Sequence, residues 1–142
     1  DMNAKCRRID NLGLVVIDYL QLMASSGTKG YSGESRQQVV SDISRMLKIM
    51  AKELQVPVLC LSQLSRANEK REDKRPMLSD LRESGAIEQD ADTVTLLHNP
   101  PCETGERMES PSLLELWLDK NRRGATGHVD ATLYKVTGRV TA

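Results

Sequence analysis

Two polar side chains follow two short apolar runs of the chain, and their types suit phosphate chemistry. Asp18 follows Leu14–Ile17, and Gln63 comes shortly after Pro57–Leu61. Apolar, β-branched runs of this length are typical of strands buried on both faces of a sheet. A carboxylate at such a strand end can orient Mg²⁺, and an amide can bond a terminal phosphate or the attacking water. Each residue also has a simpler interpretation, because Asp18 can cap a turn and Gln63 can cap a loop.

A second group of candidates is cationic. Lys120, Arg122 and Arg123 lie close together in the sequence and are followed by Gly124 and Gly127. An arginine can contact phosphate oxygens in a bidentate manner and can stabilise the charge that develops when a phosphoryl group is transferred. The same spacing also fits a basic hairpin turn that lies in solvent.

The segment Arg82–Gly85 (RESG) offers another kind of phosphate contact. A guanidinium, a hydroxyl and the N–H group of a glycine can together hold the phosphate oxygens of a nucleic-acid backbone. The simpler interpretation is the capped end of a short helix, because glycine often follows the last helical residue. His98 and His128 have no metal-ligand spacing, and the cysteines form no CxxC motif, so neither zinc nor a disulfide framework is indicated.

The elements that must position these side chains follow from the hydrophobic pattern. Between the two apolar runs, Ser35–Gln55 is predicted to be an amphipathic helix. Its apolar residues recur at spacings of three and four: Val39, Ile43, Met46, Leu47, Met50 and Leu54. Strand, helix and strand form a βαβ unit, so the two strands should be parallel neighbours or near-neighbours. Asp18 and Gln63 would then lie at the same edge of the sheet.

The remaining sequence predicts shorter elements. Asn3–Asn11 fits the last turns of a helix, Ala24–Gly33 a loop, and Asp80–Gly85 a short helix or turn that ends at glycine. Three more apolar runs predict strands: Thr93–Leu97, Leu113–Leu118 and Val129–Val136. The whole pattern is that of an α/β fold with extra strands at its C-terminal end.

Composition limits the class of protein. The 142 residues contain 20 Lys and Arg and 20 Asp and Glu, so nucleic acid can be bound only through a local cluster, not a general basic field. Mean hydropathy is −0.45, and no apolar run approaches the roughly 18 residues of a membrane span. With 3% aromatic residues and no Phe, we expect an aliphatic core and no stacking platform for single-stranded bases. The few cysteines and the absence of an apolar segment in the first residues favour a cytoplasmic protein.

One common phosphate-binding motif is missing from the sequence. No GxxxxGK[ST] loop occurs among the 142 residues. That loop normally supplies a lysine and a set of backbone N–H groups to the phosphates of a nucleotide. A nucleotide site built around Asp18 and Gln63 would therefore lack one of its usual parts within this chain.

Taken in order, the candidate segments resemble a known family. Residues 12–23 (LGLVVIDYLQLM), 35–92 and 119–127 (DKNRRGATG) closely resemble the replicative DNA helicase of bacteria, the DnaB family. The resemblance runs from about Asn3 to about Gly127 and is most literal from Leu12 to Asp92. It implies a RecA-like core of the P-loop NTPase type, with a mostly parallel sheet, in a homohexameric ring that moves along single-stranded DNA by using ATP. Primase and a helicase loader are the further partners that it implies, and no membrane is involved.

The resemblance also implies roles for the polar residues at the strand ends. Asp18 matches the Walker B aspartate, which holds Mg²⁺ directly or through water, and Gln63 matches the sensor of the γ-phosphate. Lys120 and Arg122 match the Lys-x-Arg pair that reaches the ATP of the adjacent subunit.

A DNA-binding role is implied for the RESG segment. Arg82, Glu83 and Gly85 match the loop that follows the DNA backbone in the central channel of the ring. Zero net charge agrees with this role, because the contacts are confined to a loop and are repeated around the ring.

The sequence also departs from the family. The Walker A loop, the catalytic glutamate and the N-terminal helical domain are not found, and Ala131–Ala142 does not match the apolar, aromatic end expected of the family. We therefore expect residues 1–142 to be one partial RecA-like domain, from the Walker B to the arginine-finger region. The alternative is a non-catalytic, truncated module that only binds a helicase or DNA. A recombinase of the same core fold is disfavoured by the length of the helicase-like segments.

Overall fold

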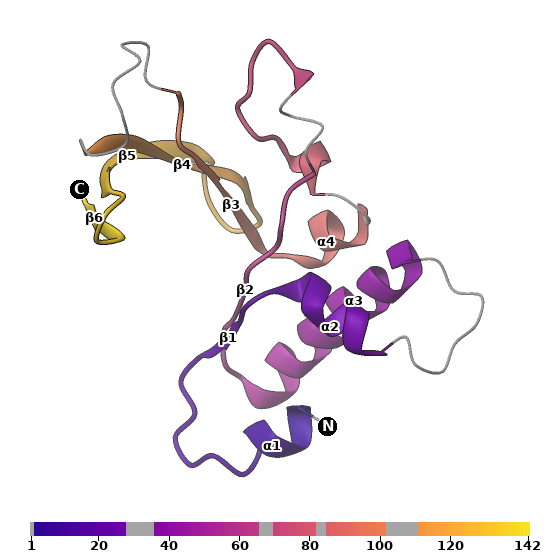
Figure 1. The fold of residues 1–142 in the computed structure, drawn as a ribbon. Helices are drawn as coiled ribbons and strands as arrows, with labels where there is room; N and C mark the ends of the chain where they lie inside the picture. The colour runs from indigo at the N-terminus through magenta and orange to yellow at the C-terminus, as the bar shows by residue number, and fades with distance from the viewer. Residues whose placement is uncertain (1, 28–35, 66–69, 82–84, 102–110) are drawn as a thin grey trace. The chain divides into compact units, whose positions relative to one another are not determined.

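The computed structural model describes residues 2–27, 36–65, 70–81, 85–101 and 111–142 (Figure 1). They divide into two compact units, the first from Asp1–Leu64 and Leu81–Ala91 and the second from Ser65–Asp80 and Asp92–Ala142. The elements of the first unit are α1 (Met2–Cys6), β1 (Val15–Ile17), α2 (Leu20–Gly27), α3 (Arg36–Leu54), β2 (Val58–Cys60) and α4 (Gly85–Asp90). Those of the second are a 3-10 helix, η2 (Leu78–Asp80), and the strands β3 (Thr93–His98), β4 (Ser112–Asn121), β5 (Gly127–Tyr134) and β6 (Arg139–Thr141). None of the described helices is long and apolar enough to cross a membrane.

The first unit contains the predicted βαβ arrangement. β1 and β2 are parallel neighbours, with Val16 paired to Leu59 and Ile17 to Cys60. Between them in sequence lies α3, whose bounds differ from the predicted helix by one residue at each end. The helix ends at Leu54 because Gln55 adopts a left-handed conformation (φ 56°), with its side-chain amide donating to the carbonyl oxygen of Lys52 at 2.6 Å.

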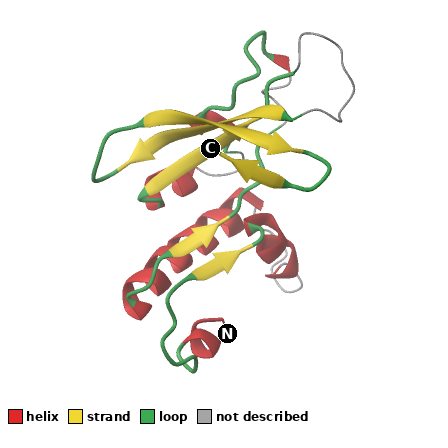
Figure 2. Cartoon of the chain, turned by 90° about the vertical axis from the view of Figure 1, so that its left-hand side faces the viewer, coloured by secondary structure: helices red, strands yellow, loops and turns green. Residues whose placement is uncertain are grey.

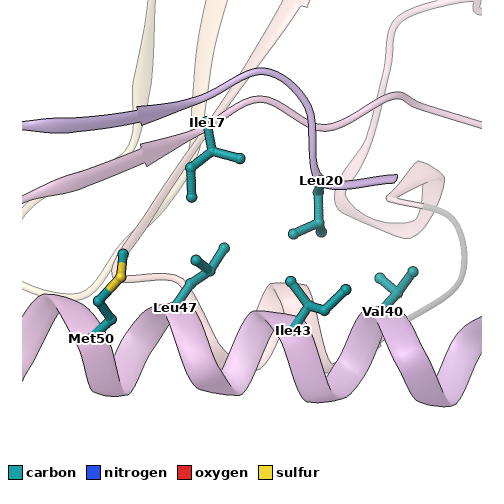
Figure 3. Packing of buried hydrophobic residues seen from close by; sticks show 6 residues of the cluster. All are labelled: Ile17, Leu20, Val40, Ile43, Leu47 and Met50. Atoms are coloured by element: carbon teal, nitrogen blue, oxygen red, sulfur yellow. The ribbon is translucent and has the colours of Figure 1, made fainter. Parts of the chain in front are cut away.

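One face of the parallel strand pair packs on α3 through an aliphatic core. Ile17 and Leu20 point toward four side chains of α3, as Figure 3 shows: Val40, Ile43, Leu47 and Met50. Val40 is fully buried, whereas Met46, predicted to lie on the apolar face, is 56% exposed. At 100° per residue, the stripe that faces the strands runs through Val40 rather than through Met46. Cys60 packs against the same core, and burial raises the pKa of its thiol.

The opposite face of this strand pair is exposed. Leu14, Val16, Leu59 and Leu61 are each between 45% and 57% exposed. The prediction of strands buried on both faces is therefore wrong for this chain. An apolar run specifies that a strand can be covered on both faces, but the covering elements must come from elsewhere in the sequence.

The second unit is an antiparallel sheet in the order β3-β4-β5-β6, drawn as yellow arrows in Figure 2. The expectation of a mostly parallel sheet is thus wrong for these strands. Parallel pairing needs a long crossover connection, and β4–β5 and β5–β6 are joined by short turns instead. At the second turn Gly138 has φ 67°, a conformation that favours glycine. That turn separates β6 from β5, where one strand, Val129–Val136, was predicted.

Three further differences concern short helices. Ala24–Gly27 belongs to α2 rather than to a loop, and the rest of the predicted loop lies outside the described residues. Packing explains α2, since its first residue, Leu20, is 2% exposed and is held by the core. Gly85 begins α4 instead of ending a helix. α1 is shorter than the predicted Asn3–Asn11.

Candidate functional site

Asp18 and Gln63 both lie beyond the carboxyl ends of adjacent parallel strands, as predicted. Asp18 follows β1 directly and is exposed, and it joins Tyr19 through a cis peptide bond. The backbone ladder continues past β2, since Leu61 N donates to Ile17 O at 2.9 Å and Leu20 N donates to Leu61 O at 3.0 Å. Gln63 follows two residues later and is also exposed. This edge is where open α/β sheets bind their ligands.

The structure adds a residue that sequence reasoning did not single out. Gln21, in the first turn of α2, is 7% exposed. Its Nε2 donates to Ser62 Oγ at 3.1 Å and to the carbonyl oxygen of Gln63 at 3.3 Å, while its Oε1 accepts from Gln63 N at 3.2 Å. A glutamine in the first turn of a helix carries no signal in the sequence that it is buried.

A shallow depression of about 300 Å³ lies at this edge, lined by Tyr19, Leu61, Ser62 and Gln63. Hydroxyl and amide groups on its wall can donate to phosphate oxygens or to a water molecule. None of these four lining residues is positively charged, so a phosphate bound here would need cations from a metal ion or from other residues.

Asp18 suits one kind of metal ion. Mg²⁺ keeps several of its water ligands and is commonly held by one or two carboxylates together with the phosphates of the substrate. A single exposed carboxylate, on the residue before Tyr19 of the depression, fits that mode. Among the described residues, no cluster of three or more His, Cys, Asp or Glu side chains could form a complete cage for a metal ion.

Lys120 and Arg122 lie at the hairpin end of β4, in the second unit. Lys120 pairs with Val94 of β3, next to a β-bulge between Val94 and Thr95. Arg122 N donates to the carbonyl oxygen of Asp92 at 2.9 Å, and the guanidinium of Arg122, about half exposed, lies 3.8 Å from the Asp92 carboxylate. The tight turn is organised by Asn121, whose side chain accepts from Arg123 N at 3.2 Å.

A polar network supports the strand that carries Lys120. The Arg75 guanidinium bonds Asp119 at 2.9 Å and lies 3.6 Å above the ring of Trp117. The other end of the same segment is fixed by Asp80, which is 3% exposed and binds Arg71 at 2.6 Å. Together these contacts fasten part of segment 70–80 to β4, the strand that ends in the cationic pair.

The two histidines have partners on the antiparallel sheet. His98 Nδ1 donates to Glu115 Oε2 at 2.8 Å, and Trp117 Nε1 donates to the same oxygen at 3.1 Å. These hydrogen bonds, the one from His98 first, lower the pKa of Glu115 below its ordinary value of 4.5. His128 stacks on Trp117 with the ring centroids 4.2 Å apart.

Of the predicted DNA-binding residues, Arg82 and Glu83 lie outside the described residues. Gly85 is exposed at the start of α4, and a Cβ atom there would meet nothing within 4 Å. Glycine lets another group approach the backbone closely, but no part of the described chain approaches Gly85 in this way. A contact of Gly85 with another molecule stays a prediction.

Comparison with known proteins adds independent evidence. The model of the DnaB-like helicase C-terminal domain matches residues 1–141. The replicative DNA helicase DnaB of Geobacillus stearothermophilus is 51% identical over 138 residues, which are 95% of this chain and 30% of that protein. The replicative DNA helicase DnaC of Bacillus subtilis (strain 168) is 50% identical over the same shares. The chain thus spans about 30% of these relatives.

Solved structures agree with the sequence relatives. One of them, described as an ATPase domain, has a TM-score of 0.80 at 40% identity, covering 98% of this chain and 48% of that one. A DnaB-like replicative helicase, described with its interactions with primase, has a TM-score of 0.79 at 44% identity, covering 94% and 33%. These neighbours confirm the fold prediction at the level of a DnaB-like ATPase domain. The family match also reaches residue 141, beyond Gly127, where the resemblance was expected to end. The chain belongs to the DnaB-like helicase C-terminal domain family.

Proposed function

We propose that this chain is part of the RecA-like motor domain of a replicative DNA helicase. The longer protein would hydrolyse ATP, move along single-stranded DNA as a homohexamer and unwind the duplex. The observation that carries this proposal is 51% identity to a replicative helicase over 95% of the chain. The parallel β1–β2 pair adds support, because the polar residues after it lie at the edge where this class of fold binds nucleotides.

Asp18 and Gln63 are proposed to serve the nucleotide of their own subunit. Asp18 would hold Mg²⁺, directly or through a water ligand, and the metal ion would neutralise charge that develops on the phosphates. Gln63 would bond the γ-phosphate or orient the attacking water through its side-chain amide. Both residues are exposed, so a ligand can reach them without unfolding the edge of the sheet.

Lys120 and Arg122 are proposed to act on the ATP of the adjacent subunit. A cation supplied from a neighbour stabilises the transition state of phosphoryl transfer and makes hydrolysis depend on assembly. The hydrogen bond within the turn and the Arg75–Asp119 pair favour this role, because they restrict the end of β4 and the turn that carry the two cations.

DNA contact is assigned to Arg82, Glu83 and Gly85, which would follow the phosphate backbone of single-stranded DNA. A primase and a helicase loader are the proposed protein partners, and the cytoplasm is the proposed location. The primase proposal draws on the similar helicase whose structure was described with its interactions with primase.

A second candidate function is favoured by one observation. The 142 residues contain no GxxxxGK[ST] loop. A protein consisting of these residues alone would be a non-catalytic module that pairs with a helicase or binds DNA weakly.

A chimera separates the two functions. Residues 1–142 would replace the matching segment of the Geobacillus stearothermophilus helicase, so that the rest of the motor is supplied by the relative. We expect the chimera to form a ring, to hydrolyse ATP in a DNA-stimulated reaction and to unwind a forked duplex. A ring that forms normally but hydrolyses no ATP, beside an active parent helicase, would favour the non-catalytic function.

A further inference from the structure

Gln21 is a buried amide with three partners in one short stretch of chain. Its side chain donates to Ser62 Oγ and to Gln63 O, and it accepts from Gln63 N. Both polar main-chain groups of Gln63 are thus bound by a single side chain. A buried side-chain amide with several partners holds them in a defined geometry, because leaving any of its polar atoms unpaired would cost free energy.

These hydrogen bonds continue the pattern of the parallel β1–β2 ladder, with a side-chain amide in place of a main-chain peptide group. Leu61 uses its N–H and C=O groups to pair with Ile17 O and Leu20 N. Two residues on, Gln63 directs the same pair of groups to the side chain of Gln21. In a strand, alternate residues direct their N–H and C=O groups to the same neighbour. The amide of Gln21 therefore takes the place of a peptide group of β1, which has already ended at Ile17.

The consequence concerns the direction of the Gln63 side chain. Fixing the N–H and C=O groups of a residue in an extended ladder also fixes where its Cβ atom points. We propose that Gln21 is a positioning residue, which holds the backbone of Gln63 so that its exposed amide is preorganised for the terminal phosphate. This inference rests on the proposed role of Gln63 as phosphate sensor.

Glutamine has particular properties for this task. Its amide combines a donor and an acceptor, so it can satisfy both main-chain groups of Gln63 at once. A glutamate would keep an acceptor for Gln63 N but would direct a second acceptor at Gln63 O. A methionine would keep the unbranched shape and lose all three bonds. Because the hydrogen bonds at Gln63 are only partly buried, water can reach the released main-chain groups, and Gln21→Met should fold.

The competing explanation is that Gln21 only fastens α2 to the end of β2. A purely structural loss would add to the effect of removing the Gln63 side chain, since the two changes would act independently. Loss of positioning would not add, because there is nothing left to position once the Gln63 amide has been removed. Comparison of single and double variants therefore distinguishes the two roles.

The experiment uses the chimeric helicase and steady-state ATP hydrolysis with saturating single-stranded DNA. We expect Gln21→Met and Gln21→Glu to lower kcat by about ten- to a hundredfold, the range that a misplacement of about 1 Å produces, with KM for ATP changed less than about threefold. The double variant Gln21→Met/Gln63→Ala should be no slower than Gln63→Ala. The control is Gln37→Met, on the exposed side of α3, which should match the unsubstituted chimera. Multiplicative losses in the double variant, or full activity of Gln21→Met, would overturn the inference.

Hydrogen exchange tests the hydrogen bonds between Gln21 and Gln63 without relying on catalysis. The main-chain amide of Gln63, followed in overlapping peptides that cover residues 61–64, should exchange about fivefold faster in Gln21→Met, since it loses one hydrogen bond of ordinary strength. Peptides from α3 should exchange as before. Unchanged exchange at residues 61–64 would show that Gln21 does not hold the backbone of Gln63. If Gln63→Ala hydrolyses ATP normally while exchange responds as expected, it is the sensor role in the proposed function that fails.

Discussion

Among single residues, a substitution at Asp18 can distinguish a metal-binding role from a structural one. We expect Asp18→Asn in the chimera to lower ATP hydrolysis on the order of a hundredfold, because the amide has the shape of the carboxylate but not the charge that holds Mg²⁺. Since Asp18 is exposed, the melting temperature should change by less than about 2 °C. Calorimetry of the same sample supplies that value. A large fall in melting temperature with modest loss of activity would instead indicate a turn-capping aspartate.

For Asp80 we expect a loss of stability instead, since its carboxylate is buried. It accepts two bonds from Arg71, at 2.6 and 3.1 Å, and one from Met77 N at 2.8 Å. Asp80→Ala removes the counter-ion of a partly buried guanidinium, which still donates to Arg75 O, and it removes the acceptor of Met77 N. The free energy of unfolding should fall by about 3 kcal/mol. Urea denaturation measures the change. Glu72→Ala, at an exposed neighbouring position, should stay within about 0.5 kcal/mol.

Whether a site residue could be found from the sequence depends on how local its signal is. Asp18 and Gln63 follow apolar runs, and the rule for parallel strands brings the two strand ends to one edge. Gln21 has no such signal, because its partners lie 41 and 42 positions further along the chain. The same holds for the Arg75–Asp119 pair, which spans 44 positions. Contacts of this kind depend on the tertiary fold, and neither composition nor spacing encodes them.

At the scale of elements, the sequence predicted best where a hydrophobic period is long. The helix from Arg36 to Leu54 has about five turns of periodic pattern, and its observed bounds lie within one residue of the prediction at each end. Strand direction in the second unit was predicted less well, since an apolar run has no direction and only the lengths of the connections distinguish antiparallel from parallel pairing. α2 was missed because its serines and glycine favour loops, whereas the burial of Leu20 and Gln21 holds its first turn.

The β3–β4 pair makes a prediction about pH. Hydrogen bonds from His98 and Trp117 lower the pKa of Glu115, so the folded sheet favours the carboxylate more than the unfolded chain does. The stabilisation is therefore complete well above the ordinary value of 4.5 and is lost as the pH falls through that value to the lowered pKa. Melting temperatures between pH 6 and pH 3 should show this loss, and Glu115→Gln should reduce the slope. Because part of the carboxylate faces solvent, the effect should be modest. An unchanged slope in Glu115→Gln would contradict the assignment.

At the scale of the whole molecule, the missing phosphate loop has a direct consequence. The 142-residue chain alone should bind no ATP in calorimetry at micromolar nucleotide and should show no hydrolysis. Backbone N–H groups of that loop normally supply most of the donors to the phosphates, and Asp18 and Gln63 offer one carboxylate and one amide instead. Saturable binding by the isolated chain would mean that the edge after β1 and β2 is sufficient for nucleotide.

The assembly gives the remaining prediction, which concerns Arg122. The guanidinium lies 3.8 Å from the Asp92 carboxylate and is about half exposed, so part of it is accessible to a ligand. If it stabilises the transition state on the ATP of an adjacent subunit, Arg122→Ala should lower turnover by about a thousandfold while ATP affinity changes little. Equilibrium binding and turnover, measured on the same ring, test both parts of this expectation.

Mixing subunits decides on which side of the interface Arg122 acts. Arg122→Ala chimeras would be combined with chimeras whose phosphate loop, supplied by the relative, has been inactivated, and mixed rings would be verified by native mass spectrometry. At some interfaces an intact loop then meets an intact Arg122 from the other kind of subunit, and hydrolysis should rise above that of either parent. If Arg122 served its own subunit's nucleotide, each defect would stay within one chain and no interface would be complete. Verified mixed rings without restored hydrolysis would therefore place Arg122 at its own subunit's nucleotide or outside the site.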